Sequence, residues 1–244
     1  MARLKRHDGR RADQLRPARI TPDFVRSADG SCLIEMGGTR VICTASFCPG
    51  VPPWRVGTGQ GWVTAEYGML PASTGSRKPR PLLKPDSRSI EIQRIIGRVL
   101  RSVVDTGQLG ENTLTIDCDV LEADGGTRTA SITGAYVAMA LALRKRRDAL
   151  AGPRVLTAGV AAVSVGLVDG AAVLDLDYHE DAAAQVDMNL AMTSRGQFVE
   201  IQGTSEHGSF DQQQLDAMLK LGRLGINRLL RLQREVLSRR GKRR

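Results

Sequence analysis

A short segment that combines two glycines, three hydroxyl side chains and an arginine is well suited to hold an anion. It spans residues 124–131 and reads Asp-Gly-Gly-Thr-Arg-Thr-Ala-Ser. Gly125 and Gly126 allow the backbone to approach a ligand, and the N-terminus of the helix expected to follow favours negative charge. Arg128 adds a planar guanidinium that matches phosphate oxygens. We predict an anion site here, with an ordinary turn capped by Thr or Ser as the alternative.

A second candidate ligand for an anion is Arg88, which stands at the start of a predicted helix between Ser87 and Ser89. Either serine could cap that helix. Because the helix dipole makes an N-terminus unfavourable for a cation, an arginine here is better explained if an anion joins it. An exposed arginine with its guanidinium in water is the alternative.

Carboxylates form the third group, in a stretch without Lys or Arg: Asp175, Asp177, Glu180, Asp181 and Asp187. The first two are predicted to share one face of a strand, and the last two flank a connection of small residues at 182–184. Carboxylates at this density repel one another unless a cation or a helix terminus lies nearby. Oxygen ligands without neighbouring cysteines suit Mg²⁺ or Mn²⁺ rather than zinc. A solvated edge with scattered acids is the alternative.

The histidines narrow the possible mechanisms. There are three, His7, His179 and His207, and none has a sequence setting typical of a general base. No serine-hydrolase or zinc-protease motif is present either. Arginines, a glycine turn and carboxylates together favour phosphoryl transfer that uses a metal and a nucleophile that is already anionic.

Basic residues are concentrated at the two ends of the chain, which has 244 residues and a net charge of +9. Residues 1–19 carry +5 and residues 219–244 carry +9, whereas the body between them carries −5. Such ends favour a polyanionic partner, because neutralising phosphates releases counterions; solvated surface charge is the alternative. Residues 239–244 are predicted to be a flexible basic tail. With no apolar run near the ~20 residues that span a bilayer and no secretory signal, we expect a cytoplasmic protein without membrane contact.

The elements that must position these residues include both strands and amphipathic helices. A Gly37-Gly38 turn predicts a hairpin in which Cys32 lies opposite Cys43, as buried thiols rather than a disulfide. Strands are predicted at 33–36, 40–47, 61–65, 114–120, 159–168, 171–176, 186–192 and 197–202, and helices from 90, from 131 to 145 and from 211. This order predicts a layered α+β fold, with residues 1–238 as a single domain.

Together, these pieces resemble the ribonuclease PH family over nearly the whole chain. Two long strings carry the resemblance, Glu-Tyr-Gly-Met-Leu-Pro at 66–71 and the glycine-rich segment at 124–131. Shorter matches lie at 8–10, 15–17, 91–94, 117–120, 180–181, 186–189 and 202–204. The sequence departs from the family at Ser87, where glycine is common.

The resemblance implies the ribonuclease PH fold, with ribosomal-protein-S5-like layers of mixed sheets and helices, assembled as a homohexamer (a trimer of dimers). It implies a phosphate-dependent 3′→5′ exoribonuclease that trims the 3′ ends of tRNA precursors. Nucleoside diphosphates would be released, and the reverse reaction would add nucleotides. The alternative is a catalytically inactive RNA-binding ring subunit of the same fold.

The resemblance also implies roles for particular residues. Inorganic phosphate, the co-substrate, would be bound by Arg88, Gly126, Thr127 and Arg128. Mg²⁺ or Mn²⁺ would be bound by Asp181 and Asp187, which with Arg128 would support catalysis. RNA would be contacted by Arg77, Lys78, Arg80 and Arg94.

Overall fold

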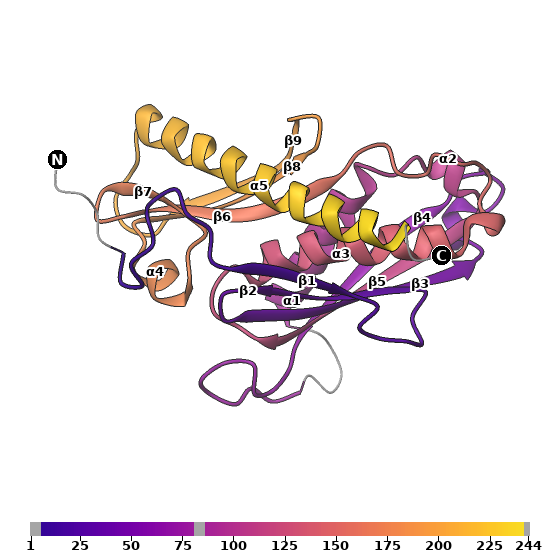
Figure 1. The fold of residues 1–244 in the computed structure, drawn as a ribbon, viewed down its shortest axis with the longest axis horizontal. Coiled ribbons are helices and arrows are strands. Elements are labelled where there is room, and N and C mark those ends of the chain that lie inside the picture. The colour runs from indigo at the N-terminus through magenta and orange to yellow at the C-terminus, as the bar shows by residue number, and fades with distance from the viewer. Residues whose placement is uncertain (1–5, 81–85, 242–244) are drawn as a thin grey trace.

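Two β-sheets with helices packed on them form the structure, a computed structural model that describes residues 6–80 and 86–241 (Figure 1). The first sheet has five strands in the spatial order β1-β2-β3-β5-β4. They are β1 (Ala18–Pro22), β2 (Gly30–Met36), β3 (Thr39–Pro49), β4 (Trp62–Met69) and β5 (Asn112–Glu122). Neighbours are antiparallel except β4 and β5, which run parallel because helix α1 (Ser87–Arg101) carries the chain back between them.

The second sheet has four antiparallel strands in the order β7-β6-β8-β9. They are β6 (Val160–Val168), β7 (Ala171–Leu174), β8 (Val186–Thr193) and β9 (Phe198–Ser205). Helix α4 (Tyr178–Ala183) connects β7 to β8. The long helix α5 (Gln212–Gly241) lies along β6 and continues toward the first sheet, so it joins the two halves (Figure 1). The connections also contain η1 (Pro53–Arg55), α2 (Thr106–Leu109) and η2 (Arg147–Ala149).

Helix α3 (Thr127–Lys145) lies at the centre of the core. Every residue from 129 to 143 is buried, so the helix has no polar face. It packs on β2 and β3 of the first sheet and on β6 of the second. Its small residues allow this close approach, since a Cβ at Gly134 would lie 2.7 Å from the Cys43 sulfur. The start of α3 is therefore held firmly between the two halves of the chain.

The hairpin around the Gly37-Gly38 turn confirms the predicted register. Met36 pairs with Thr39, and Cys32 pairs with Cys43. Both thiols are buried and free, as predicted. The four strands predicted in the second half are also present, and they pair as the hairpins β6–β7 and β8–β9. The two sheets with helices packed on them confirm the predicted α+β class.

The end of β7 departs from the prediction. The strand stops before Asp175, which has a left-handed backbone conformation with φ of +56°. Asp175 and Asp177 therefore do not share a strand face. Asp177 instead caps α4, and its side chain accepts a hydrogen bond from the Glu180 N–H. The connection predicted at 182–184 is partly helical, since α4 extends to Ala183.

Two helix starts also differ from the prediction. Helix α3 begins at Thr127 rather than near Ser131, because the glycine turn ends in Gly126, which is itself the N-cap residue. Helix α1 is capped by neither Ser87 nor Ser89. Its cap is Asp86, whose carboxylate accepts a hydrogen bond from the N–H of the residue three positions along the chain.

The C-terminal end is more helical than predicted. Helix α5 continues through Gly241, so residues 239–241 of the predicted tail belong to it, and residues 242–244 lie outside the described residues. Within the part of the chain that the structure describes, no helix combines the length and apolar character needed to cross a membrane.

Candidate active site

A cavity of about 570 Å³ lies where the two halves of the chain meet. The end of β4, the start of α1, the start of α3, helix α4 and strand β8 all contribute residues to its wall. All the residues predicted to bind phosphate or metal are among those that line it: Arg88, Gly126, Thr127, Arg128, Asp181 and Asp187. Residues separated by about 100 positions in the chain are thus brought to one place.

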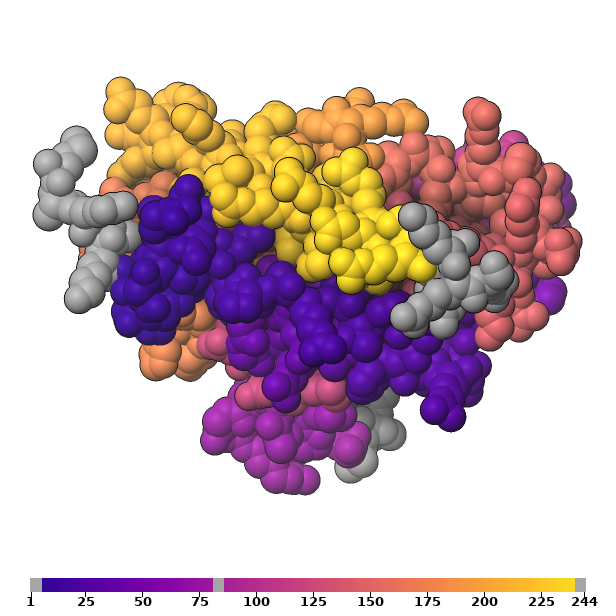
Figure 2. All heavy atoms as spheres, viewed as in Figure 1, coloured from indigo at the N-terminus to yellow at the C-terminus, as the bar shows by residue number. Residues whose placement is uncertain are grey.

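The residues predicted to contact RNA are divided. Lys78 lines the cavity, and Arg77 and Arg80 are exposed in the same loop after β4, which projects from the body at the bottom of Figure 2. Arg94 is exposed on α1. Of these four described residues, only Lys78 belongs to the cavity wall.

The glycine turn at the start of α3 has a double structural role. Gly125 and Gly126 both have left-handed backbone conformations, with φ of +71° and +64°. A Cβ on Gly125 would lie 2.6 Å from the Asp177 carbonyl carbon, so this glycine allows the turn to pack on the start of α4. Because Gly126 is the N-cap, no side chain of that residue satisfies the first amides of the helix. The turn capped by Thr or Ser is therefore not what the chain forms.

Side chains from other elements hold the first turn of α3. The Tyr67 hydroxyl, on β4, donates a hydrogen bond of 2.9 Å to the Thr127 hydroxyl. Arg128 donates from Nη1 to the side-chain oxygen of Gln202 on β9. Arg88 has no ion pair or hydrogen bond from its side chain to any other described residue, which leaves its guanidinium available at the cavity. The wall thus presents two arginines and a helix N-terminus, a combination that attracts phosphate.

Asp181 and Asp187, which we call the open carboxylate pair, line the same cavity as these arginines. Partial burial raises the pKa of Asp181, and the charge of Asp187 raises it further, whereas Arg88 and Arg128 oppose the change. Burial also raises the pKa of Asp187, with the Glu206 carboxylate as the next cause. Neither acid forms an ion pair with a described residue. Their oxygens are therefore free to bind a cation.

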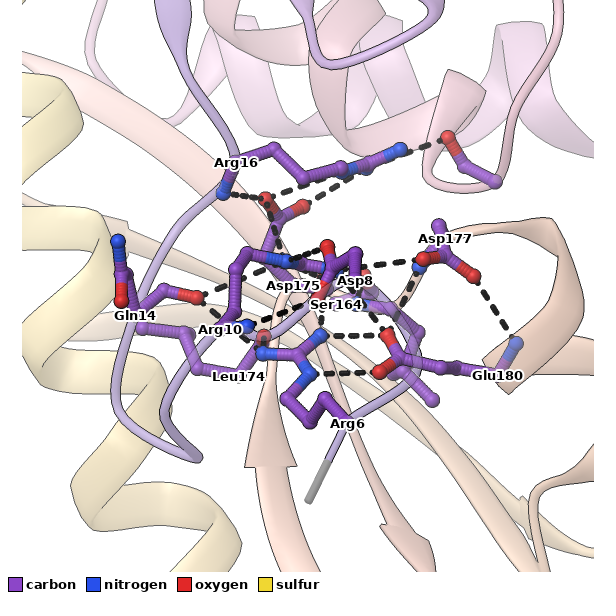
Figure 3. Close-up of polar contacts among 12 residues, drawn as sticks. Arg6, Asp8, Arg10, Gln14, Arg16, Ser164, Leu174, Asp175, Asp177 and Glu180 are labelled. Atoms are coloured by element: carbon purple, nitrogen blue, oxygen red, sulfur yellow. Dashed lines mark hydrogen bonds and ion pairs between the residues drawn. The ribbon is translucent and has the colours of Figure 1, made fainter.

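The other three carboxylates of the stretch are engaged elsewhere. They form a buried arginine–carboxylate network with three N-terminal arginines (Figure 3): Arg6, Arg10, Arg16, Asp175, Asp177 and Glu180. Arg6 Nε lies 2.6 Å from Glu180 Oε1, and Arg16 Nη2 lies 2.8 Å from Asp175 Oδ1. These side chains are all buried, and each of the three carboxylates accepts a hydrogen bond from an arginine of the network.

This network is joined to the cavity at two points. Arg16 donates hydrogen bonds to the backbone carbonyls of Asp124 and Gly125, so it holds the glycine turn. Asp177 caps the helix that carries Asp181. The His7 ring nitrogen also lies 2.6 Å from Asp177 Oδ2. The network therefore positions two parts of the cavity wall: the glycine turn at the start of α3 and helix α4, which carries Asp181.

These N-terminal arginines were not predicted to be structural residues, and their charge was attributed to binding of a polyanionic partner. The signal that was available lay in the short matches at 8–10 and 15–17, which contain Arg10 and Arg16. Tyr178 was also missed. It lines the same cavity as the two arginines and is 62% exposed.

Comparison with known proteins identifies the family and the fold of this chain. A model described as "3′ exoribonuclease family, domain 1" matches residues 14–145, and one for domain 2 of the same family matches residues 159–224. Rice (Oryza sativa) Rrp46 superposes with a TM-score of 0.77 at 19% identity, covering 95% of this chain and 100% of that chain.

Two archaeal structures have the same fold. An Archaeoglobus fulgidus exosome with RNA bound to the active site contains a chain with a TM-score of 0.76 at 23% identity, covering 92% of this chain and 91% of that one. An archaeal exosome core gives 0.74 at 21% identity, covering 94% and 91%. The fold predicted from the sequence resemblance is confirmed.

Proposed function

The chain belongs to the 3′ exoribonuclease family, and from this premise we propose that it degrades RNA from the 3′ end by phosphorolysis. The products would be nucleoside diphosphates, and the same site would run in reverse. One observation carries the proposal: Arg88 and Arg128 share a single cavity with Asp181 and Asp187. Such a cavity can hold an anionic nucleophile against an anionic substrate.

The proposed reaction uses orthophosphate as the nucleophile. One of its oxygens attacks the phosphorus of the last phosphodiester, a new P–O bond forms, and the P–O3′ bond breaks. The 3′ oxygen of the shortened RNA then takes a proton from solvent. Orthophosphate needs no general base, but two anions must be held in contact. Arg88, Arg128 and the first amides of α3 would offset that repulsion.

A divalent cation fits the other wall of the cavity. The open carboxylate pair offers only oxygen ligands and has no neutralising ion pair among the described residues. The pKa values of both acids are raised, so a bound cation would offset the cost of ionising them. Mg²⁺ or Mn²⁺ suits such ligands. We propose that Asp181 and Asp187 hold this ion, which when bound would stabilise charge on the leaving 3′ oxygen.

The RNA would approach along the exposed basic loop. Lys78, Arg77 and Arg80 lie on it, and Arg94 lies on the outer side of α1. Tyr178 at the cavity offers a face on which a base can stack. We propose tRNA precursors as substrates and a homohexamer, a trimer of dimers, as the assembly.

A second function is suggested by the likeness of the fold to a chain of an archaeal exosome core. This alternative is an inactive RNA-binding ring subunit. The presence of both arginines and both carboxylates in one cavity favours activity, because a binding subunit has no need of the open carboxylate pair.

The test follows a 3′-extended tRNA incubated with the purified chain and Mg²⁺, with and without inorganic phosphate. We expect shortening only with phosphate, and nucleoside diphosphates as products. Shortening that does not depend on phosphate would contradict phosphorolysis. Binding of the tRNA without any shortening in either condition would support the inactive subunit.

A further inference from the structure

Three side chains from three elements form a chain of hydrogen bonds that ends at the cavity. Arg128 on α3 donates from Nη1 to the side-chain oxygen of Gln202 on β9. Gln202 in turn donates from Nε2 to Glu91 Oε1 on α1, over 2.8 Å. Glu91 is exposed and Gln202 is half-buried, so the chain runs from the surface to the cavity wall. Nothing in the phosphorolysis mechanism above uses Gln202 or Glu91.

The order of groups in this chain has an electrostatic consequence. Arginines are usually held in place by carboxylates, which form the strongest hydrogen bonds with them but also neutralise their charge. Here the carboxylate of the chain of hydrogen bonds, Glu91, is separated from Arg128 by a neutral amide. The amide oxygen accepts a hydrogen bond from the guanidinium without adding a negative charge. Arg128 is therefore fixed and remains available as a cation.

Glu91 has a separate effect on the orientation of the amide. A carboxylate can only accept hydrogen bonds, so it requires the NH₂ group of Gln202 to face it. The Gln202 oxygen must then face Arg128. Without Glu91, the amide could turn its NH₂ toward the guanidinium, where two donors would oppose each other.

We propose that Gln202 is a positioning residue that holds Arg128 toward inorganic phosphate while leaving its charge unneutralised, with Glu91 setting the direction of the amide. This inference rests on the proposed function, in which Arg128 binds phosphate. It predicts that a carboxylate at position 202 weakens phosphate binding more than removal of the side chain does, although the carboxylate would form the stronger hydrogen bond with Arg128.

The experiment measures the dissociation constant for inorganic phosphate by calorimetry, without RNA, for the full chain and its variants. We expect Gln202→Glu to raise the constant about tenfold, because the new ion pair competes with phosphate. Gln202→Ala should raise it about threefold, through loss of one hydrogen bond. Glu91→Gln should have the smallest effect, about twofold. Gln197→Glu, at the exposed turn of the same hairpin, is the control for added charge and should match the parent.

A dissociation constant for Gln202→Glu within twofold of the parent, or below that of Gln202→Ala, would overturn the inference. If the glutamate variant fails to fold, the double variant Glu91→Gln/Gln202→Glu removes the repulsion between two carboxylates. Its dissociation constant for phosphate is then compared with those of the parent and of Gln202→Ala by the same criteria. Phosphate binding by a parent that does not shorten RNA would contradict the proposed function alone. A parent that does not bind phosphate would overturn both.

Discussion

Glu180 and Asp181 are neighbours on one short helix, yet their carboxylates have opposite environments. Glu180 is 5% exposed and forms ion pairs with two arginines of the buried arginine–carboxylate network. Asp181 belongs to the open carboxylate pair, where no described residue neutralises it and partial burial raises its pKa. Two neighbouring carboxylates thus have different roles. The Glu180 carboxylate stabilises the fold, whereas the Asp181 carboxylate is ionised at an energetic cost, which suits ligand binding.

The two groups also depend on each other. The network holds the glycine turn through Arg16 and caps α4 through Asp177. It therefore keeps the walls of the cavity in place while the charges of the open pair repel each other. An open pair on an unsupported loop could move apart and lose its geometry.

Loss of a network carboxylate is expected to have the largest effect on stability. Asp175→Asn should lower the free energy of unfolding by about 3 kcal/mol, because it leaves the buried Arg16 with only the longer ion pair of 3.7 Å to Asp124. Asparagine tolerates the left-handed backbone at this position, so the change tests the charge. Thermal unfolding measures the effect. The control is Asp169→Asn, at an exposed turn with the same backbone conformation, and equal melting temperatures for the two variants would contradict the role of the network.

The same substitution in the open carboxylate pair should instead affect activity. We expect Asp187→Asn to reduce phosphorolysis about a hundredfold, through loss of a metal ligand and its stabilisation of the leaving oxygen. Its melting temperature should not fall, because no described ion pair is broken. The rate is measured with saturating RNA over a range of Mg²⁺ concentrations. An unchanged dependence on Mg²⁺ would place the metal elsewhere.

A smaller effect of opposite sign is expected for the stability of Asp181→Asn. Because the pKa of Asp181 is raised in the folded protein, its contribution to stability falls as pH rises above the usual aspartate value of about 3.9 and through the folded value. Removing the carboxylate should then stabilise the chain at pH 7 by about 0.5 kcal/mol. The measurement is thermal unfolding in EDTA. Added Mg²⁺ should raise the melting temperature of the parent more than that of the variant, and a destabilised variant would be the opposite of this expectation.

The smallest effect concerns the exposed edge of the network. The hydrogen bond to Asp177 raises the pKa of His7, so its contribution is complete below about pH 6.5 and is lost as pH rises through the folded value. Burial opposes ionisation of Asp177, but the Glu180 amide and His7 hold its pKa below the usual range, so its contribution is lost in acid. Between pH 6 and 8, the melting temperature of His7→Gln should change less than that of the parent.

The matched control for this pH dependence is His207→Gln, which alters an exposed loop histidine. Its melting temperature should follow that of the parent across the same range. Parallel curves of melting temperature against pH for the parent and for His7→Gln would show that the His7–Asp177 contact does not contribute to stability.

Local features of the fold were predictable from the sequence. The Gly37-Gly38 turn determined the register of the first hairpin, and strongly β-forming segments marked the strands on either side of Asp169-Gly170. Helix α4 was missed, because a short segment ending in alanines has no apolar periodicity and its capping depends on a neighbouring turn. The start of α3 was placed late, because its glycine N-cap is also a turn signal.

The network and the site were predictable to different degrees. Arg6 and Glu180 are 174 positions apart, and no spacing rule links residues at that separation. Their acidic partners therefore looked unpaired in the sequence, and the N-terminal arginines looked like surface charge. Arg128 and Asp187 were nominated by residue type and by family resemblance, but their common cavity became visible only in the folded chain. Arg77, Arg80 and Arg94, also nominated, lie outside it.

In phosphorolysis, free phosphate held in this cavity becomes part of the product. The most direct measurement supplies radiolabelled orthophosphate with unlabelled 3′-extended RNA and identifies the labelled nucleotides. We expect nucleoside diphosphates labelled at the terminal phosphate for the parent chain, and none for Arg128→Ala. Unlabelled nucleoside monophosphates would show that water is the nucleophile and would exclude phosphorolysis.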